Sequence, residues 1–505
     1  MGQRRRGVIC PRLSRRAELT ALLTLALAVR LIGVNRPYIS VHWIKQLQVA
    51  PIALNFYQHG YNIWWPETDY SADRPAYIEI EFQLVTWLTA LLYKLFGVHE
   101  AVGRLVAIGF SMAGIGLLFL LMRDLLGYRA AVYGLLFYAF APSSVYFGRV
   151  LMSEPAMLCL SIATVYFFHR FTQTGRFLFY CAALVAAALA FLVKLPTVHL
   201  AIPLAYLAIR RWGWGAVRQP GLWVFAALSL LPAAIYYVHA HRDIGPQYFT
   251  VGVGFGGNMW FEVRHFLSPK SYSLMVSRLL KDHLTAVGMV LLVLGVFYRM
   301  GRPKREALFL WWLAGVAVYF VVVSGGNLRQ TYYQLPLLPA AAGLVGPAWA
   351  LVSRLRAFRP GGNTALVGLF AILSIWGAQP FYEEYTPILR AAAVLDRLDP
   401  SRQPVIVMPP GYGCLYYLRR PGWVGREAMG KPAEWVKSAA DLPSPAYFED
   451  RIRRGARWVV FFSAPPGEAR PDLLAYLRAN FSVAHSDPDF IVFDLARRLS
   501  EKRRP

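Results

Sequence analysis

Long apolar segments recur along most of this chain, and they constrain its fold more than any other feature. We identify eleven of them, near residues 18–34, 103–122, 130–147, 152–169, 177–193, 197–209, 221–238, 284–298, 306–323, 333–352 and 364–379. An α-helix needs about 20 apolar residues to cross a bilayer, and some of these segments fall slightly short. The hydrophobic content of 56% is also high for a soluble domain. The sequence therefore predicts an α-helical polytopic membrane protein with about eleven spans.

The positions of the basic residues predict how these spans are oriented. The net charge is +25, and the cations sit mostly in short connections between apolar segments. Lys and Arg in short loops favour the cytoplasmic side. If residues 82–97 do not cross the membrane, one side collects Arg4, Arg5, Arg6, Arg12, Arg15, Arg16, Arg123, Arg129, Arg170, Arg176, Arg210, Arg211, Arg218, Arg299, Arg302, Lys304, Arg305, Arg354, Arg356 and Arg359. We therefore predict an interfacial helix at 82–97.

This orientation predicts a protein of the cell (inner) membrane with its N-terminus in the cytoplasm and its C-terminus outside. Two long loops, 35–102 and 239–283, then face outward. Cations distributed in this way argue against nucleic acid as a partner, although the net charge is high. The predicted environment is the lipid bilayer.

The last 120 or so residues change character. Strand-like segments at 404–408, 458–462 and 490–493 alternate with helical patterns at 387–398, 444–454 and 470–480. That alternation predicts a small α/β domain. We therefore expect a transmembrane domain over 1–382 and an extracytoplasmic α/β domain over 383–505, for which a stabilising cap without chemistry is one interpretation. The cysteines, Cys10, Cys159, Cys181 and Cys414, show neither a disulfide arrangement nor a metal-binding spacing.

Polar and aromatic side chains gather on the predicted outer face. They are His42, Lys45, Gln46, Asn55, Asp69 and Glu81 in the first loop, followed by Arg149, Glu154, Lys194, His265, Arg329, Tyr332 and Tyr333. A sugar carried on a polyprenyl phosphate presents an anionic phosphate, which Lys and Arg bind by charge-assisted hydrogen bonds. Its acceptor needs a general base within hydrogen-bond reach. The set therefore predicts a site for a lipid-carried sugar, with Glu154 paired to Arg149 at one membrane end.

Structural alternatives stay open for each of these residues. Glu154 and Glu81 could favour helix starts, and Lys194 could extend toward the membrane surface. Tyr332 and Tyr333 could belong to an interfacial aromatic belt. His265 is a surface residue or, with Glu81, a ligand of a divalent metal that would neutralise the leaving phosphate. The cofactor is otherwise undetermined.

Several motifs resemble the GT-C membrane glycosyltransferases of the family 39 group, which includes protein O-mannosyltransferases and lipid A aminoarabinose transferases. His42 to Tyr57 follows the frame HxWRQxDTAxIARNFY, and Glu81-Phe82-Gln83-Leu84 follows EFPL. Tyr332 to Pro339 resembles YYxLPLLP, and Tyr416 to Trp423 resembles YYxxRxGW. The resemblance implies catalysis by Glu81 and Glu154, with Lys45, Arg149 and Lys194 directed toward the phosphate. It implies transfer from a polyprenyl-phosphate sugar to a lipid, glycan or protein acceptor, by single displacement with inversion.

The chain departs from this pattern at informative positions. Gln48 stands where the motif has an acid, Val49 replaces the following Thr, and Lys45 replaces an Arg. Glutamine cannot act as a general base, so Glu81, Asp69 or Glu154 would have to do so. An inactive relative that binds lipid-linked sugar therefore stays open, as do a transporter or flippase for lipid-linked sugar and a polymerase or ligase of surface polysaccharide.

Overall fold

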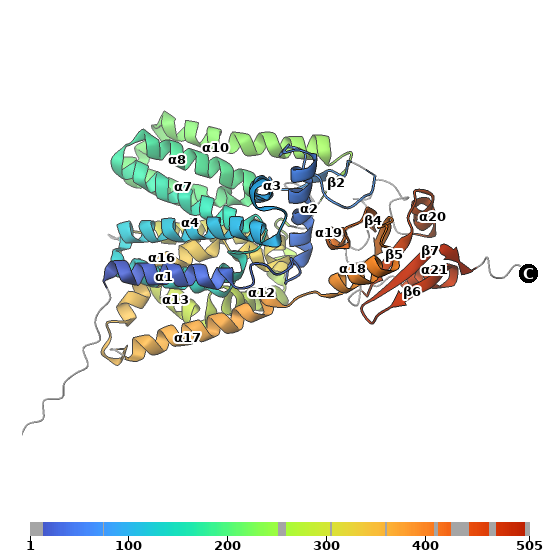
Figure 1. Cartoon of the computed structure of the whole chain (residues 1–505). Helices are drawn as coiled ribbons and strands as arrows, with labels where there is room; N and C mark the ends of the chain where they lie inside the picture. The colour runs from blue at the N-terminus through green and yellow to red at the C-terminus, as the bar shows by residue number, and fades with distance from the viewer. Residues whose placement is uncertain are drawn as a thin grey trace, which may run out of the picture.

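A computed structural model describes residues 14–73, 75–250, 259–302, 306–358, 361–408, 413–425, 444–463 and 471–499. A helical bundle forms most of the molecule, and a small sheet domain lies beyond one end of it (Figure 1). The bundle contains α1 (Arg15–Leu31), α4 (Glu100–Leu126), α5 (Tyr128–Phe140), α6 (Pro142–Phe147), α7 (Glu154–Thr174), α8 (Phe177–Val193), α9 (Ala201–Trp212), α10 (Pro220–His239), α13 (Thr285–Met300), α14 (Leu308–Val322), α16 (Leu337–Val352) and α17 (Gly361–Ala378).

The eleven predicted apolar segments all lie in helical parts of the chain, but few are long enough to cross a membrane alone. Among the described residues, three helices qualify by length and composition: Glu100–Leu126, Pro220–Ile244 and Gly361–Tyr382. A fourth span results if Pro269–His283 and Thr285–Met300, which meet at a 104° bend, are counted together. The other helices are shorter, as α9 shows with 12 residues. The structure therefore supports several apolar spans, and the number eleven stays a prediction.

Close backbone contact holds α5 against α16. A Cβ atom added to Gly134 would lie 2.8 Å from the carbonyl oxygen of Ala342. One added to Gly346 would lie 3.1 Å from the backbone nitrogen of Gly134, and closer still to the carbonyl oxygen of Ala130. Small residues permit this approach, which is typical of helix pairs in membranes.

The described basic connections meet at one end of the bundle, which we call the basic end. The hydroxyl of Tyr128 donates to the carbonyl of Arg15 at 2.6 Å, and the Arg15 guanidinium lies 5.2 Å from the Tyr128 ring centroid. One cavity there is lined by arginines from five connections, namely Arg129, Arg170, Arg210, Arg299 and Arg354. This agrees with the prediction that these loops share a side. Arg4, Arg5, Arg6, Arg12, Lys304, Arg305 and Arg359, together with Cys10, lie outside the described residues.

The first long loop covers the opposite end of the bundle, which we call the loop end. It contains α2 (Trp43–His59), which runs across that end in Figure 1, and α3 (Leu84–Phe96). The predicted helix at 82–97 is thus present as α3, although its interfacial position stays a prediction. Strand β1 (Ile78–Glu79) pairs in parallel with β2 (Phe249–Thr250) of the second loop.

Short helices connect the longer ones. They are α11 (Arg264–Leu267), α12 (Pro269–Arg278), α15 (Ser324–Arg329), the 3₁₀ turns η1 (Leu195–Leu200), η2 (Gly213–Arg218), η5 (Thr331–Gln334), η6 (Arg356–Phe358) and η7 (Gln379–Tyr382), and the π-helical turns η3 (Ala240–Ile244) and η4 (Leu279–His283). The π turn η4 precedes the sharp bend before α13, where Thr285 has a φ of 61°.

The C-terminal domain is a five-stranded mixed sheet with the strand order β4-β3-β5-β7-β6. Its strands are β3 (Val405–Met408), β4 (Gly422–Val424), β5 (Trp458–Phe462), β6 (Phe481–Ser486) and β7 (Phe490–Arg498), and its helices are α18 (Pro387–Leu398), α19 (Cys414–Leu418), α20 (Pro445–Arg453) and α21 (Pro471–Asn480). The three predicted strands correspond to β3, β5 and β7, and the three predicted helices to α18, α20 and α21. The sequence analysis missed β4, β6 and α19.

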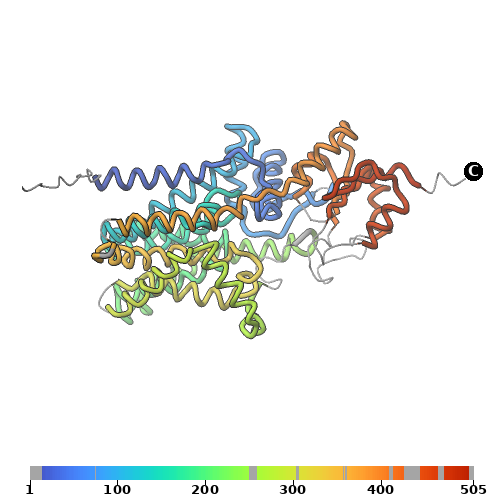
Figure 2. Tube along the Cα trace, turned by 90° about the horizontal axis from the view of Figure 1, so that it is seen from below, coloured from blue at the N-terminus to red at the C-terminus, as the bar shows by residue number. Residues whose placement is uncertain are grey.

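This domain docks on the first loop, at the loop end of the bundle, as Figures 1 and 2 both show. A Cβ atom on Gly413, which has a φ of 98°, would lie 2.5 Å from the Cβ of Leu47 in α2. The backbone N–H of Tyr38 donates to the Tyr417 hydroxyl at 2.7 Å. The Trp423 indole donates to Asp73 at 3.0 Å. The YYxxRxGW stretch therefore connects the domain to the membrane bundle.

Candidate active site

Lys45 and Glu81 form an ion pair between the two helices of the first loop. His42 adopts a left-handed conformation with a φ of 63°, and α2 begins directly after it, so that Lys45 lies in its first turn. Glu81 lies just before α3, where its backbone carbonyl accepts a 2.7 Å hydrogen bond from the Gln83 amide. The Lys45 ammonium lies 2.9 Å from Oε1 of Glu81, with the two side chains only 17% and 9% exposed.

Glu154 and Lys194 form a second ion pair. Glu154 is the first residue of α7 and Lys194 directly follows α8. These helices are joined at the basic end, so the start of α7 and the end of α8 meet at the loop end. The Lys194 ammonium donates to Oε1 of Glu154, whose side chain is fully buried. The same ammonium lies 4.9 Å and 5.3 Å from the ring centroids of Tyr332 and Tyr333.

Ser153 joins the two ion pairs. Its hydroxyl lies 3.4 Å from Oε1 of Glu81 and 3.5 Å from Oε2 of Glu154. The five residues Lys45, Glu81, Ser153, Glu154 and Lys194 therefore form one continuous arrangement, which we call the Lys–Glu array. Two carboxylates and two ammonium groups offset each other's charge, which permits their burial.

The pKa values in this region reflect the balance between burial and charge pairing. Burial raises the pKa of Glu81, but Lys45 and Lys194 lower it by more, so it lies below the ordinary value. Burial lowers the pKa of Lys194, but Glu154, Tyr333 and Glu81 outweigh burial and place it above the ordinary value. Both groups are therefore charged at neutral pH.

His42 and aromatic rings form one wall beside the array. The His42 ring centroid lies 5.3 Å from that of Tyr332 and 5.5 Å from that of Phe147. Burial lowers the pKa of His42 to about 4, with a further contribution from Arg278, so its imidazole is neutral at pH 7. Its buried Nε2 atom has no hydrogen-bond partner among the described residues. A cavity of about 10 Å³ adjoins Lys194, Tyr332 and Tyr333, which is room for roughly one water molecule.

Arg149 does not pair with Glu154, contrary to the sequence-based expectation. Its guanidinium donates to the carbonyl of Gly33 at 2.6 Å and lies 5.3 Å from the Tyr382 ring. Lys194 occupies the position that was expected for Arg149. The end of α8, and not the turn before α7, places a cation beside the Glu154 carboxylate. Gln46, in the first turn of α2, is buried beside the array. Its side-chain amide donates to the Ser40 hydroxyl at 3.2 Å.

Asp69 and Asn55 lie away from the array. The Asn55 amide donates to the Glu67 carbonyl at 3.0 Å and to the Asp69 carboxylate at 3.3 Å. Asn55 follows Lys45 by ten residues in α2, which places it about 15 Å farther along the helix axis. Arg329 is exposed at the end of α15. The structure therefore brings together Glu81 and Glu154 but not the third predicted acid.

The carboxylates of the array are poorly suited to a divalent metal, because each already faces a lysine. Within the described ranges, no three His, Cys, Asp or Glu side chains are placed to hold a metal ion. Nδ1 of His265 lies 3.0 Å from the Ser324 hydroxyl, and its Nε2 lies 3.8 Å from Glu262. Lys45 and Lys194 supply the positive charge that a cation would otherwise bring.

Arg278 is a residue that the sequence analysis missed. It lies at the end of α12, and its guanidinium donates to the carbonyls of Asn327 and Leu328 at 2.8 and 3.1 Å. Its charge also lowers the pKa of His42. Nothing in the sequence distinguished it from other loop cations, because its proximity to His42 arises only from the bend before α13.

Comparisons with known proteins place the sequence of the bundle and the fold among membrane glycosyltransferases. Residues 83–237, which contain Glu154 and Lys194, match the sequence model of the family described as dolichyl-phosphate-mannose-protein mannosyltransferase. The structure is similar to ArnT from Cupriavidus metallidurans in the apo state, with a TM-score of 0.67, 16% identity and coverage of 94% of this chain and 97% of that one. The chain therefore shares the fold of these membrane glycosyltransferases, and part of its helical bundle matches the mannosyltransferase family model.

Other solved structures share this fold. ArnT from Cupriavidus metallidurans bound to undecaprenyl phosphate gives a TM-score of 0.64 at 16% identity, with 94% and 97% coverage. The Archaeoglobus fulgidus oligosaccharyltransferase in the apo form gives 0.51 at 13% identity, covering 88% of this chain and 69% of that one. A comparison with curated proteins finds no significant match.

Proposed function

We propose that this GT-C chain transfers a sugar from a polyprenyl-phosphate carrier to an acceptor at the loop end of the bundle. The Lys–Glu array is the observation that carries the proposal. It combines cations for a phosphate with carboxylates for a proton, in a buried position beside aromatic rings. The ArnT structure with undecaprenyl phosphate, which has the same fold, supports a lipid-phosphate donor.

The proposed reaction is a single displacement with inversion. The acceptor oxygen attacks the anomeric carbon of the sugar, the bond from that carbon to the phosphate oxygen breaks, and its electron pair stays on the phosphate. The acceptor proton passes to a carboxylate. Lys45 and Lys194 stabilise the negative charge on the departing phosphate.

Donor binding would also activate the base. In the structure, Lys45 and Lys194 lower the pKa of Glu81. A phosphate that attracts these ammonium groups competes with the carboxylates for them, so the Glu81 pKa rises toward its ordinary value and the group becomes a stronger base. We assign the base to Glu81, because its side chain is 9% exposed whereas Glu154 is fully buried. Glu154 then positions Lys194.

The other predicted ligands fit supporting roles. His42, Tyr332 and Tyr333 border the array and are placed to contact the sugar or the phosphate. Arg149 and Gln46 hold the surrounding backbone and side chains in place. Asn55 contacts Asp69 farther along the first loop, and Arg329 is exposed at the end of α15. We propose these three residues as contacts for the acceptor or as loop supports.

Transfer by purified protein in lipid vesicles tests this function. With labelled polyprenyl-phosphate sugars, Glu81→Gln should lower kcat by about 10²–10⁴-fold through loss of the base. Lys194→Gln should also lower the transfer activity, even though this variant keeps the proposed base, Glu81. Glu262→Gln is a matched control, because Glu262 is an outer-loop acid paired with Arg264 outside the array.

The outcomes separate the alternatives. Sugar release by wild type that Glu81→Gln leaves intact would remove Glu81 from the role of base. Tight binding of carrier lipid without turnover on any donor would indicate an inactive relative. If the protein shows neither binding nor turnover, the transport hypothesis gains support.

We further propose that eleven helical segments cross the membrane, with the basic end in the cytoplasm and the C-terminal domain outside. The distribution of cations supports this orientation. Reporter fusions at the C-terminus should give activity from an alkaline phosphatase, which folds outside the cytoplasm, and none from a cytoplasmic fluorescent protein. The reverse result would contradict the orientation and move the Lys–Glu array to the cytoplasmic side.

A further inference from the structure

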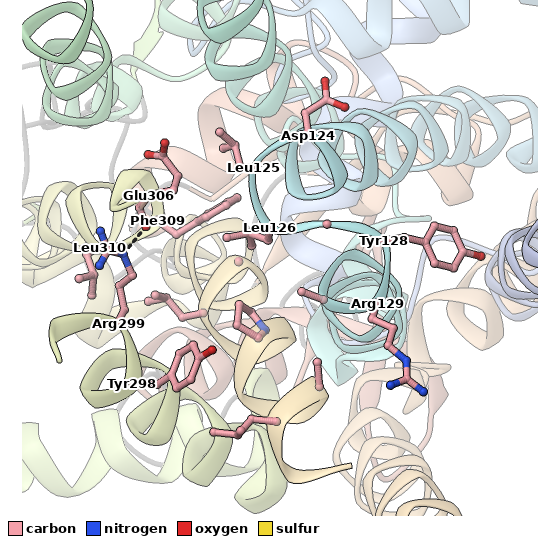
Figure 3. A pocket seen from close by; sticks show the side chains of 18 of the residues that line it. Asp124, Leu125, Leu126, Tyr128, Arg129, Tyr298, Arg299, Glu306, Phe309 and Leu310 are labelled. Carbon is pink, nitrogen blue, oxygen red and sulfur yellow. Dashed lines mark hydrogen bonds between the residues drawn. The ribbon is translucent and has the colours of Figure 1, made fainter. Parts of the chain in front are cut away.

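A large cavity lies at the basic end, far from the Lys–Glu array. Its volume is about 980 Å³, and its walls come from α4, α5, α7, α9, α13, α14 and α16. In Figure 3, Tyr298, Arg299 and Glu306 lie on one side of it and Tyr128 and Arg129 on the other. His169 lines this cavity and follows Glu154 by 15 residues in α7, so the two sites are separated by about 23 Å along the helix.

The lining carries an excess of positive charge. Arg129, Arg170, Arg210, Arg299 and Arg354 face two carboxylates, Asp124 and Glu306. Asp124 lies 3.2 Å from Arg170, the Glu306 carboxylate pairs with Arg210, and the Arg299 guanidinium donates to the backbone carbonyl of Glu306. Arg129 and Arg354 have no carboxylate partner among the described residues, and both are exposed. The cavity therefore attracts anions.

Buried polar atoms at the wall lack partners. His169 is only 6% exposed, and its Nδ1 atom makes no hydrogen bond within the described parts of the chain. The buried Nε of the adjacent Arg170 is also without a hydrogen bond there. Unpaired buried polar groups are costly, so atoms such as these point to an absent ligand. An oxygen-rich anion would accept hydrogen bonds from this part of the wall.

Apolar side chains complete the lining. Leu125, Phe309, Leu310 and Leu344 contribute to it, together with Leu351, which is 41% exposed. Exposed apolar residues at the surface of a membrane bundle face lipid chains. The cavity thus offers guanidinium groups for a head group and an apolar wall for a hydrocarbon chain.

We propose that this cavity binds the phosphate of an anionic membrane lipid, at the opposite end of the bundle from the proposed transfer site. Arg129 and Arg354 supply charge, His169 and Arg170 donate hydrogen bonds to the phosphate, and one lipid chain lies along Leu344 and Leu351. This site is independent of the proposed glycosyl transfer. It would hold a lipid of the leaflet at the basic end and stabilise the helices that surround it.

Binding of short lipids to the full-length protein in neutral detergent tests the proposal. The thermal unfolding midpoint is titrated with dioctanoyl phosphatidic acid, with dioctanoylglycerol, which lacks the phosphate, and with inorganic phosphate. Phosphatidic acid should raise the midpoint most. The double variant Arg129→Gln/Arg354→Gln should weaken its affinity by about tenfold or more, since two charge-assisted contacts are lost. Arg176→Gln/Arg218→Gln is the matched control, because both arginines are exposed at the basic end but neither lines the cavity.

His169→Asn provides a second variant that leaves the net charge unchanged, and we expect it to weaken phosphatidic acid binding as well. Equal affinity of the wild type and the Arg129/Arg354 variant would place the lipid elsewhere and overturn the proposal. Equal binding of dioctanoylglycerol would show that the phosphate is not recognised. Equal affinity for inorganic phosphate would assign the cavity to soluble phosphate compounds and overturn the lipid assignment.

Discussion

At the residue scale, the chain pairs each charge of the Lys–Glu array with an opposite one. Lys45 faces Glu81, and Lys194 faces Glu154. His42 differs, because it is kept neutral beside these charges by burial and by the cation Arg278. A neutral imidazole with an unpartnered Nε2 can either accept or donate a hydrogen bond, which suits contact with a sugar hydroxyl or a phosphate.

His42 should make the protein less stable in mild acid. Its pKa is about 4 in the folded protein and about 6.5 in the unfolded chain, so the unfolded state binds the proton first as the pH falls. The stabilisation is complete above about pH 6.5 and is lost between pH 6.5 and 4, by up to about 3 kcal/mol. Burial raises the pKa of Glu81, but Lys45 and Lys194 lower it by more, so this carboxylate protonates at a lower pH than an ordinary glutamate.

The measurement is the thermal unfolding midpoint between pH 7.5 and 4. His42→Asn should flatten the decrease, since Asn does not titrate and tolerates the left-handed φ of 63°. His485→Asn, in strand β6 of the C-terminal domain, is the control and should behave as wild type. An unchanged pH profile in His42→Asn would contradict the assignment.

At the scale of elements, the site depends on close packing of the bundle helices. The array forms because α7 and α8 place their ends together, while α5 and α16 hold the bundle through glycine contacts. Helices in a membrane gain little from burying apolar surface against each other, so close van der Waals contact and small residues carry more of the association.

Gly346→Ala should therefore destabilise the bundle by about 1–3 kcal/mol, because the added methyl group meets the backbone of α5 at Ala130 and Gly134. Gly368→Ala is the matched control. It lies in α17 with no atom within 4 Å of an added Cβ, and alanine there should be neutral or stabilising by up to about 1 kcal/mol. Equal unfolding midpoints of the two variants in detergent would contradict the packing argument.

At the scale of the whole molecule, the C-terminal domain and the first loop form one unit over the loop end. Asp73 of the loop accepts a hydrogen bond from the Trp423 indole and lies 3.1 Å from Arg454. Tyr417 receives the Tyr38 N–H, and Gly413 lies against α2. The domain thus fixes α2, which supplies Lys45 to the array. This gives the predicted cap a definite structural role.

Asp73→Ala should weaken this docking by about 1–2 kcal/mol. Most of that comes from the Trp423 hydrogen bond to a carboxylate, because the ion pair with Arg454 is about half exposed on both sides and contributes little. Hydrogen exchange of residues 75–80 and 422–424 should become faster, and transfer activity should fall through looser placement of α2. Arg453→Gln is the control, since among the described residues Arg453 pairs only with Asp450 of its own helix. Unchanged exchange in Asp73→Ala would show that Asp73 does not hold the domain.

The sequence by itself determined the helical bundle, the segregation of cations to one end, and three strands and three helices of the C-terminal domain. It also predicted the four charged residues that the structure brings together in the candidate site. These features follow from local composition and periodicity, which act within a few turns of chain. The sequence pointed to four charged residues because such residues are unusual beside the ends of apolar helices. They are Glu81, Glu154, Lys45 and Lys194.

Only the tertiary structure decided which of these residues meet. Glu154 pairs with Lys194 rather than Arg149, because α8 ends beside the start of α7. Asp69 is close to Glu81 in sequence, but it contacts Asn55. Asn55 lies farther along α2 than Lys45, so Asp69 lies away from the array. The antiparallel edge β6–β7 and the position of Arg278 beside His42 also depend on long-range packing. Side-chain direction and helix neighbours fix such contacts, and neither can be read from the chain alone.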